Sequence, residues 1–317
     1  MAKKLYINYK NQDYRTSYFK SPPDDLMVKL GWEIMNFKTF LSIKTDDFTK
    51  YLIDENIKVI LCFNNYGNFI NECKEFLLKN NIYILIYSND LHCKNNIINS
   101  KKFNLNKMIH DLDNIYICAN YYYCYLQFYN IDLKRIIKYP AFVDEDYYVN
   151  FNSNPINKIL LSGTKTKEYP ARKKLNAISG YNNNIDVIKN TIYLGHDFIK
   201  YLNKYLCCFT CCLNKSIPYI IGKFFEIPSS GSLLLAYDEF VKDELINLGF
   251  IDGVNYISCS LNNIEDKIEY ILNPDNLKKI NEIRKNGYEF VWKYHTQSDR
   301  LKYIDNFVND NLINFNK

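Results

Sequence analysis

The sequence has 317 residues, of which 47% are hydrophobic and 24% are charged, and this length is enough for two folded domains of ordinary size. With 10 Gly and 8 Pro against 29 Tyr and 20 Phe, the composition fits neither a disordered chain nor a protein made of many short strands. The net charge of +5 comes without any block of basic residues, which argues against a nucleic-acid-binding surface.

Over the first 140 residues, apolar runs alternate with helix-like stretches, which is the pattern of a parallel sheet. We expect strands at Lys4–Tyr9, Val59–Phe63, Ile82–Tyr87 and Ile115–Ala119, and helices at Asp25–Met35, Asn68–Asn80 and Tyr121–Tyr129. A polar, Asn-rich stretch between Tyr139 and Asn157 has the composition of a connection between domains. We place the end of the first domain at residue 147.

The second half repeats the alternation of strands and helices. We expect strands at Lys158–Leu161, Thr191–Leu194, Leu206–Leu213, Ser232–Ala236 and Tyr256–Cys259. The expected helices are Arg172–Ser179, Asp197–Lys204, Lys223–Ser230, Glu239–Leu248, Ile264–Leu272, Asn276–Tyr294 and Gln297–Leu312. The sequence therefore predicts an α/β protein with a second domain over residues 148–299 and a C-terminal segment, 300–317, that packs back on the first domain. The carboxyl ends of two such parallel sheets would face one cleft, where sheets of this kind bind ligands.

The N-terminus begins Met1-Ala2-Lys3-Lys4, without the apolar stretch or small-residue cleavage site of a signal peptide. No segment approaches the roughly 18 consecutive apolar residues that a membrane-spanning helix needs. We therefore expect a soluble, cytoplasmic protein whose ten cysteines are reduced.

Four of these cysteines are clustered in the segment Cys207-Cys208-Phe209-Thr210-Cys211-Cys212. The segment contains the CxxC spacing of metal and redox sites, but no second CxxC or HxxxH pair is present to complete a zinc site. It lies within a β-prone run, residues 205–213, that is bounded by polar residues. We interpret it as a buried strand rather than a metal or redox centre.

The densest motif runs from Gly222 to Ala236, with the sequence GKFFEIPSSGSLLLA. A glycine before a helix allows close approach of a ligand, and the start of the helix favours an anion. A carboxylate one turn later, Glu226, could accept both hydroxyls of a ribose, and Gly231 allows tight contact before the next strand. An acid in the first turn also stabilises a helix by itself, so the residues alone leave both interpretations open.

Several motifs together carry a resemblance to a known family. They are residues 222–236, residues 248–256 (LGFIDGVNY), Asn286-Gly287, His295-Thr296, Arg300, residues 160–163 (LLSG) and residues 169–172 (YPAR). This combination resembles the donor-binding half of group-1-like glycosyltransferases, and within them the branch that includes bacterial spore-maturation-type proteins. The resemblance covers Ile159 to Arg300, whereas the first half matches only in its βα rhythm and in Asp90-Leu91-His92.

The resemblance implies a GT-B fold, in which two Rossmann-like domains face a central cleft. It implies an enzyme of glycan biosynthesis that transfers a sugar from a UDP- or GDP-linked donor to a hydroxyl of a glycan or other acceptor. It also implies no bound metal or other cofactor, because cationic side chains and a helix dipole can neutralise a departing diphosphate. The acidic runs Asp46-Asp47 and Asp144-Glu145-Asp146 resemble metal-binding DxD motifs only superficially.

By this resemblance, Glu226 holds the donor ribose and Gly222 belongs to the loop beside the diphosphate. Ser229, Ser230 and Gly231 correspond to residues that line the adjoining helix. Many relatives carry a second Glu seven positions before the ribose Glu, where it touches the transferred sugar. Here that position is Tyr219, a departure that leaves the donor sugar and the stereochemistry open.

Cationic residues that could contact the diphosphate flank these motifs. Gly163 ends the first strand of the second domain, where backbone close to a phosphate or acceptor is expected. Arg172 offers a planar, permanently charged fork for a diphosphate, and Lys165, Lys167 and Lys223 could add point charges. Solvated surface charge is the competing interpretation, and it is favoured for the lysines more than for Arg172.

Two histidines lie at expected strand ends. His92, with Asp90 to orient it, follows the strand at Ile82–Tyr87 and could deprotonate an acceptor hydroxyl, although it could also simply cap a turn. His196 lies at a strand end in the second domain, near where the base of the donor could lie, but the neighbouring Asp197 could serve only to cap a helix.

Other functions stay open at this stage. A nucleotide-sugar epimerase of the same fold and a non-catalytic protein that binds nucleotides or glycans are both compatible with the motifs, the latter because Tyr219 replaces the second Glu. A nicotinamide dehydrogenase is disfavoured because no GxGxxG follows any expected strand. The oligomeric state is open, a homodimer included.

Overall fold

The computed structural model describes residues 2–8, 22–63, 67–88, 112–119, 132–165, 169–188, 195–212 and 218–314. These residues form two compact units. The first unit combines the described residues up to Pro140 with those from Ser298 onward, and the second unit runs from Ala141 to Gln297. The chain thus passes from the first unit to the second after Pro140, a few residues before the boundary that we expected at residue 147.

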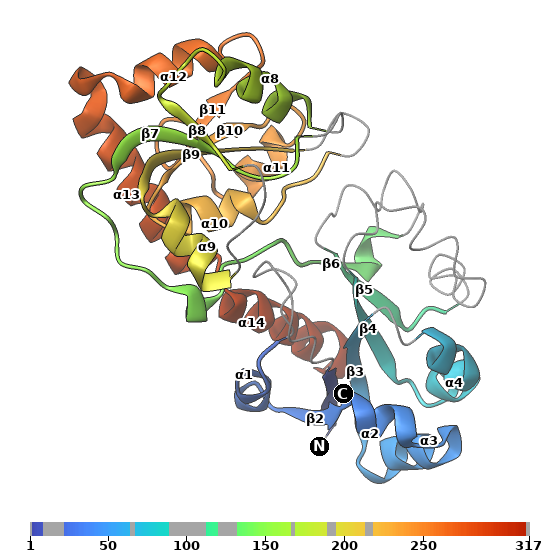
Figure 1. Cartoon of the computed structure of the whole chain (residues 1–317). Helices are drawn as coiled ribbons and strands as arrows, with labels where there is room; N and C mark the ends of the chain where they lie inside the picture. Colours follow the sequence, from blue (N-terminus) through green and yellow to red (C-terminus); the bar gives the residue numbers. More distant parts are fainter. Residues whose placement is uncertain are drawn as a thin grey trace. The chain divides into compact units, whose positions relative to one another are not determined.

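The first unit contains a sheet of six parallel strands in the order β2-β1-β3-β4-β5-β6 (Figure 1). The strands are β1 (Lys3–Asn8), β2 (Trp32–Asn36), β3 (Ile57–Phe63), β4 (Tyr83–Ser88), β5 (Ile115–Ala119) and β6 (Ile136–Lys138). The described helices are α1 (Asp24–Lys29), α2 (Phe37–Ser42), α3 (Thr45–Asp54), α4 (Gly67–Lys79) and α14 (Gln297–Val308), with shorter helical turns at Leu133–Arg135 and Asn309–Ile313. Strands such as β4 are apolar at nearly every position because helices cover both faces of the sheet.

The helix expected over Asp25–Met35 is wrong in its second half. Helix α1 ends at Lys29, and Gly31 adopts a φ of +78° that ends the helix before β2 begins at Trp32. β2 then pairs in parallel with β1. Apolar residues of the short strand continue the helical spacing of α1, so the pattern concealed the strand. Helices α2 and α3 and strand β6 were also not expected, and the helix expected at Tyr121–Tyr129 lies outside the described residues.

Helix α14 packs on the first sheet on the side opposite α4 (Figure 1). Its buried Asp305 accepts bonds from Lys4 Nζ at 2.5 Å and from Trp32 Nε1 at 2.7 Å. Asn309, one turn further on, donates to the other carboxylate oxygen at 3.0 Å. One carboxylate therefore joins the C-terminal helix to β1 and β2.

The second unit contains a sheet of five parallel strands in the order β11-β10-β9-β7-β8. The strands are β7 (Ile156–Leu161), β8 (Ile185–Val187), β9 (Tyr205–Cys211), β10 (Leu233–Tyr237) and β11 (Ile257–Cys259). The helices are α8 (Pro170–Ile178), α9 (Gly195–Leu202), α10 (Lys223–Ser229), α11 (Lys242–Asn247), α12 (Ile264–Leu272) and α13 (Leu277–Tyr294), with shorter turns at Glu145–Tyr147 and Pro274–Asn276. Figure 1 shows α8 and α12 on one side of this sheet and α9, α10 and α13 on the other.

The strand order of the second sheet has a functional consequence. After β7 the chain moves to one side to form β8, and it then returns to form β9 on the other side of β7. Parallel sheets bind ligands at the carboxyl ends of the two strands where the order reverses. The ends of β7 and β9 are therefore the expected binding edge of this unit.

The cysteine-rich segment forms β9, and the interpretation as a buried strand is confirmed. All seven residues of β9 are buried. Burial raises the pKa of the Cys208 and Cys212 thiols to about 12, so these thiols stay protonated. Among the described residues, no group of three or more His, Cys, Asp or Glu side chains is placed to hold a metal ion. The strand expected at Thr191–Leu194 lies outside the described residues, and β8, which does flank β7, was not expected.

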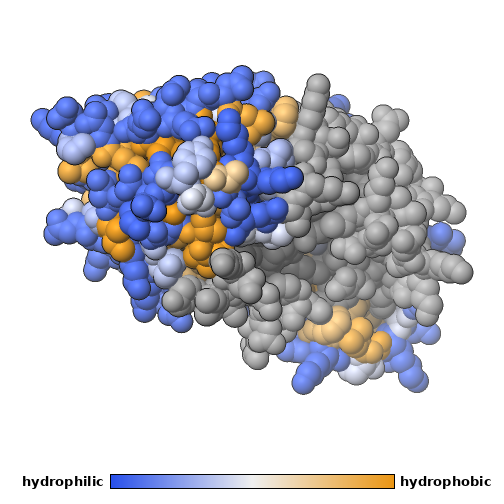
Figure 2. Space-filling model, turned by 45° about the horizontal axis from the view of Figure 1, so that its top comes forward, coloured by the Kyte–Doolittle hydropathy of each residue, from blue (hydrophilic) through white to orange (hydrophobic). Residues whose placement is uncertain are grey.

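The described residues expose both polar and apolar side chains. Figure 2 shows hydrophilic side chains that separate the apolar areas on the face in view. Exposed apolar side chains in the second unit include Ile246, Ile251 and Val254. None of the described helices combines the length and the apolar character that a membrane span requires.

Replacing Asp305 with alanine is expected to destabilise the first unit by about 3–5 kcal/mol, because the buried Lys4 ammonium would lose its carboxylate. Chemical denaturation monitored by tryptophan fluorescence measures the effect, since Trp32 is itself a partner of Asp305. The exposed Asp310 is the control, and its replacement by alanine should change stability by no more than about 0.5 kcal/mol. Equal midpoints for the two variants would contradict the anchoring role of Asp305.

Candidate anion-binding site

The carboxyl end of β7 carries a glycine that two cationic side chains approach. Gly163 has a φ of +98°, a conformation that favours glycine. A Cβ atom at this position would lie 2.7 Å from Lys223 Nζ and 3.1 Å from Arg172 Nη1. Both cations therefore converge on one point of the backbone, and a side chain at residue 163 would displace them.

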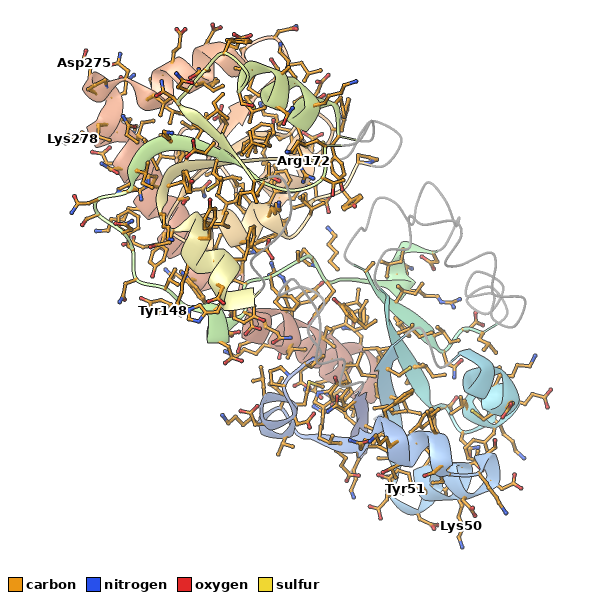
Figure 3. All side chains as sticks on the ribbon, in the orientation of Figure 1. Lys50, Tyr51, Tyr148, Arg172, Asp275 and Lys278 are labelled. Atoms are coloured by element: carbon orange, nitrogen blue, oxygen red, sulfur yellow. The ribbon has the colours of Figure 1, made fainter. Side chains whose placement is uncertain are left out.

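Arg172 reaches this point from helix α8, and Figure 3 labels it in the second unit. Its side chain is buried, with 3% of the residue surface exposed. Nη1 donates to the backbone oxygen of Thr164 at 3.2 Å, and the guanidinium carbon lies 4.0 Å from the ring centroid of Tyr169. Nε is buried and has no hydrogen-bond partner among the described residues. Arg172 thus keeps donor capacity that the fold does not use.

Lys223 is the first residue of α10 and is half-buried. Its Nζ donates to Ser162 Oγ at 2.9 Å and lies 5.5 Å from the ring centroid of Phe198. The pKa of Lys223 is lowered to about 7, chiefly by loss of hydration and also by the nearby positive charge of Arg172, while the charge of Glu226 acts in the opposite direction. The side chain therefore changes its charge near neutral pH.

No ion pair joins Arg172 or Lys223 to a carboxylate within the part of the chain that the structure describes. Two like charges that are removed from water without a counter-charge are costly. A phosphate or diphosphate supplies both negative charge and several acceptor oxygens, and arginine binds such groups in a bidentate manner. The arrangement at Gly163 is therefore suited to a multiply charged anion.

Glu226 lies three residues after Lys223 on α10 and is 2% exposed. Its backbone N–H donates to the oxygen of Gly222 at 3.0 Å. Gly222 itself has a φ of −49°, within the helical region open to all residues, so its backbone conformation does not require glycine. The structure brings Glu226 into electrostatic contact with Lys223, which places the expected ribose acid beside the cationic pair.

Ser229, Ser230 and Gly231 lie at the other end of α10, and the structure does not bring them to Gly163. The Ser229 and Ser230 hydroxyls donate to the backbone oxygens of residues 226 and 227. Gly231 has a φ of +82° and accepts hydrogen bonds from the guanidinium of Arg284. These contacts close the helix and anchor it to α13, and donor binding by these three residues stays a prediction.

Tyr219 is 6% exposed and its side chain interacts with that of Tyr169, so it belongs to the surroundings of Arg172. His196 lies at the start of α9, where its Nε2 is 3.2 Å from the backbone oxygen of Tyr148 and its ring is parallel to that of Tyr147. Its contact with a donor stays a prediction. Asp90, His92 and Lys167 lie outside the described residues.

Sequence reasoning did not assign a role to Ser162 or Tyr169, although both stand next to residues that it selected. Ser162 directly precedes Gly163, and its buried hydroxyl accepts from Lys223. Tyr169 precedes Arg172 by three positions, a spacing that brings two side chains together on a helix. The i,i+3 spacing was a usable signal for Tyr169, whereas the partner of Ser162 is 61 positions away.

Comparisons with solved structures support the fold. A glycosyltransferase from Rickettsia africae ESF-5 is 13% identical, with 98% of this chain and 99% of that chain covered and a TM-score of 0.56. Anabaena Alr3699/HepE in complex with UDP-glucose is 10% identical, with 98% and 100% covered and a TM-score of 0.57. A putative UDP-N-acetylglucosamine 2-epimerase from Listeria monocytogenes is 13% identical, with 98% and 97% covered and a TM-score of 0.51.

No protein-family model matches the sequence, and no curated protein matches it either. At these low identities the structural similarity establishes the fold. The expected α/β fold with two parallel sheets, as in GT-B glycosyltransferases, is confirmed over nearly the whole chain.

Replacing Lys223 with methionine is expected to raise the thermal unfolding midpoint by a few degrees at pH 6 to 7, with a smaller gain at pH 9 to 10. Folding lowers the pKa of Lys223 from 10.5 to about 7. Between pH 7 and pH 10.5, Lys223 is therefore protonated to a greater extent in the unfolded chain than in the folded protein. Lys223 therefore destabilises the folded protein most below pH 7, and this effect decreases as the pH rises from 7 to 10.5.

Thermal scans at pH 6.5 and 9.5 measure this difference. Lys278→Met, which removes an exposed lysine from α13, controls for the loss of a positive charge and should show no such trend. A gain for the Lys223 variant that is the same at both pH values would show that Lys223 keeps its charge throughout.

Proposed function

We propose that this protein is a glycosyltransferase that moves a sugar from a nucleotide-diphosphate donor to a hydroxyl of a glycan or other acceptor. The observation that carries the proposal is the convergence of Arg172 and Lys223 on Gly163, with no salt bridge from either cation to a carboxylate among the described residues. This cationic pair lies where the strand order reverses, at the edge where such sheets bind nucleotides. The similarity in fold to a protein that was solved with UDP-glucose supports the same assignment.

The cations account for the chemistry that such a transfer needs. When the bond between the anomeric carbon and the diphosphate oxygen breaks, the electron pair stays on the diphosphate and its negative charge increases. Arg172 and Lys223 would stabilise that charge more strongly in the transition state than in the bound donor. We propose that they do so in place of a metal ion, with a UDP- or GDP-linked sugar as the donor.

Glu226 is the proposed ribose ligand. A buried carboxylate can accept hydrogen bonds from both ribose hydroxyls at once, as acidic residues do in nucleotide-binding folds. Its place on α10, one turn after Lys223, fits the covalent structure of a nucleotide, in which the ribose directly precedes the phosphates. We further propose that Gly222, Ser229, Ser230, Gly231, Tyr219 and His196 surround the donor.

Acceptor activation is assigned to His92, with Asp90 as the group that orients its ring. A histidine of ordinary pKa is suited to remove the proton of the attacking hydroxyl at neutral pH. This part of the proposal rests on the sequence, in which both residues follow the strand β4.

Calorimetric titration of wild-type protein with UDP, GDP and the corresponding nucleosides tests the donor site. In Arg172→Ala, the affinity for the nucleoside diphosphate should fall about 10- to 100-fold, the loss of a charge-assisted hydrogen bond, with no change for the nucleoside. In Glu226→Ala, both affinities should fall because both ligands contain the ribose. Lys278→Ala, at an exposed site on α13, is the control.

Turnover distinguishes the alternatives. Slow hydrolysis of a UDP- or GDP-sugar to free sugar and nucleoside diphosphate supports a transferase. Conversion of the sugar within the donor, without any acceptor, would identify an epimerase, the activity named for the Listeria structure. Tight nucleotide binding without turnover would identify a binding protein, and an unchanged diphosphate affinity in Arg172→Ala would overturn the site itself.

A further inference from the structure

We propose that Tyr169 is a positioning residue of the anion site, whose ring holds the Arg172 guanidinium toward Gly163 without neutralising its charge. The inference rests on the proposed function, since it takes Arg172 to be the phosphate-binding residue. A buried arginine is ordinarily oriented by a carboxylate, which would also cancel the charge that a phosphate needs. An aromatic face attracts a cation and yet leaves the net charge of the pair at +1.

The geometry at Arg172 fits this role. The guanidinium carbon lies 4.0 Å from the Tyr169 ring centroid, well within the range for a cation over an aromatic face. The guanidinium carbon lies over the ring, and this contact does not by itself occupy the N–H groups. Nη1 uses the backbone oxygen of Thr164, while the buried Nε has no partner among the described residues.

The position of Tyr169 at the start of α8 also supports this role. It is the N-cap residue of the helix, where Ser, Thr, Asp and Asn are preferred because their side chains accept a hydrogen bond from the first turn. Tyr169 makes no such bond. The Tyr169 side chain therefore does not cap the helix. It instead contacts Arg172, three residues later.

A second tyrosine lies next to Tyr169. The Tyr169 side chain interacts with that of Tyr219, which is buried in the segment that leads into α10. That segment also leads to Lys223, the second cation. The contact between Tyr169 and Tyr219 thus links the surroundings of Arg172 on α8 to the segment before α10.

Lys223 is supported in a similar way. Its Nζ lies 5.5 Å from the centroid of the buried Phe198 ring and donates to the neutral Ser162 hydroxyl. Each cation therefore has one aromatic ring and one neutral oxygen among its contacts. Arg172 is thus held in place with its permanent charge not cancelled by a salt bridge among the described residues.

A double-mutant cycle on the full-length protein tests the inference. The variants are Tyr169→Phe, Tyr169→Leu, Arg172→Ala and Tyr169→Leu/Arg172→Ala, titrated by calorimetry with UDP, GDP and inorganic pyrophosphate. We expect Tyr169→Leu to weaken binding of these anions about 2- to 30-fold, which corresponds to the loss of one cation–π contact. Tyr169→Phe, which keeps the aromatic face, should stay within about threefold of wild type.

The readout that separates positioning from general damage is the double variant. If Tyr169 acts through Arg172, then Tyr169→Leu should cause no further loss once Arg172 is absent, and nucleoside affinity should not change in any variant. Thermal scans confirm that each variant is folded. Tyr181→Leu removes an exposed tyrosine just after α8 and should leave anion affinity unchanged.

Two outcomes would overturn the inference. Additive losses in the double variant, or an unchanged affinity in Tyr169→Leu while Arg172→Ala is impaired, would show that the ring does not position the guanidinium. An unchanged affinity in Arg172→Ala would instead remove the proposed function on which the inference rests, so the two failures can be told apart.

Discussion

The second unit is organised around two positive charges that meet at a single glycine. Arg172 comes from α8 and Lys223 from α10, helices that lie on opposite sides of the same sheet. They can meet only beyond the end of the sheet, where β7 has stopped and Gly163 leaves room for them. The strand order, the left-handed conformation of Gly163 and the neutral contacts of both cations all serve this one constraint. Because like charges in poor contact with water repel each other, Arg172 helps to lower the pKa of Lys223, and a bound anion would offset this repulsion.

The same constraint makes Lys223 sensitive to its ligand. With a pKa of about 7, its ammonium form is only partly populated at neutral pH in the free protein. A bound anion favours the charged form and raises the pKa, so binding above pH 7 takes up a proton. Lysine is the residue suited to this behaviour, because an arginine at the same place would stay charged at all physiological pH values. The pair thus combines one permanent charge with one that forms as the ligand arrives.

Arg172 and Lys223 could each be selected from the sequence, but their proximity in the fold could not be predicted from it. Gly163 and Arg172 stood out because glycine is scarce and because arginine suits a diphosphate better than lysine does. Lys223 was selected too, although solvated surface charge was the favoured interpretation for each lysine, and for Lys223 the structure shows a half-buried side chain bonded to Ser162. Lys223 meets Gly163 because β9 follows next to β7, and strand order is a property of the whole sheet that local patterns do not encode. Short strands such as β2 and β8 were missed because a few apolar residues fit a helix as well as a strand.

The two glycines that the sequence placed near the diphosphate are not equivalent in the structure. Gly222 has helical torsion angles, whereas Gly163 has a positive φ and lies at the point where the cations converge. We therefore expect the close backbone approach of a phosphate at Gly163 rather than at Gly222. Lys223 and Glu226 are three residues apart on one helix and hence share a face. A nucleotide bound with its phosphates at Gly163 would place its ribose one helical turn further along α10, so the direction of the donor follows from the order of these two residues.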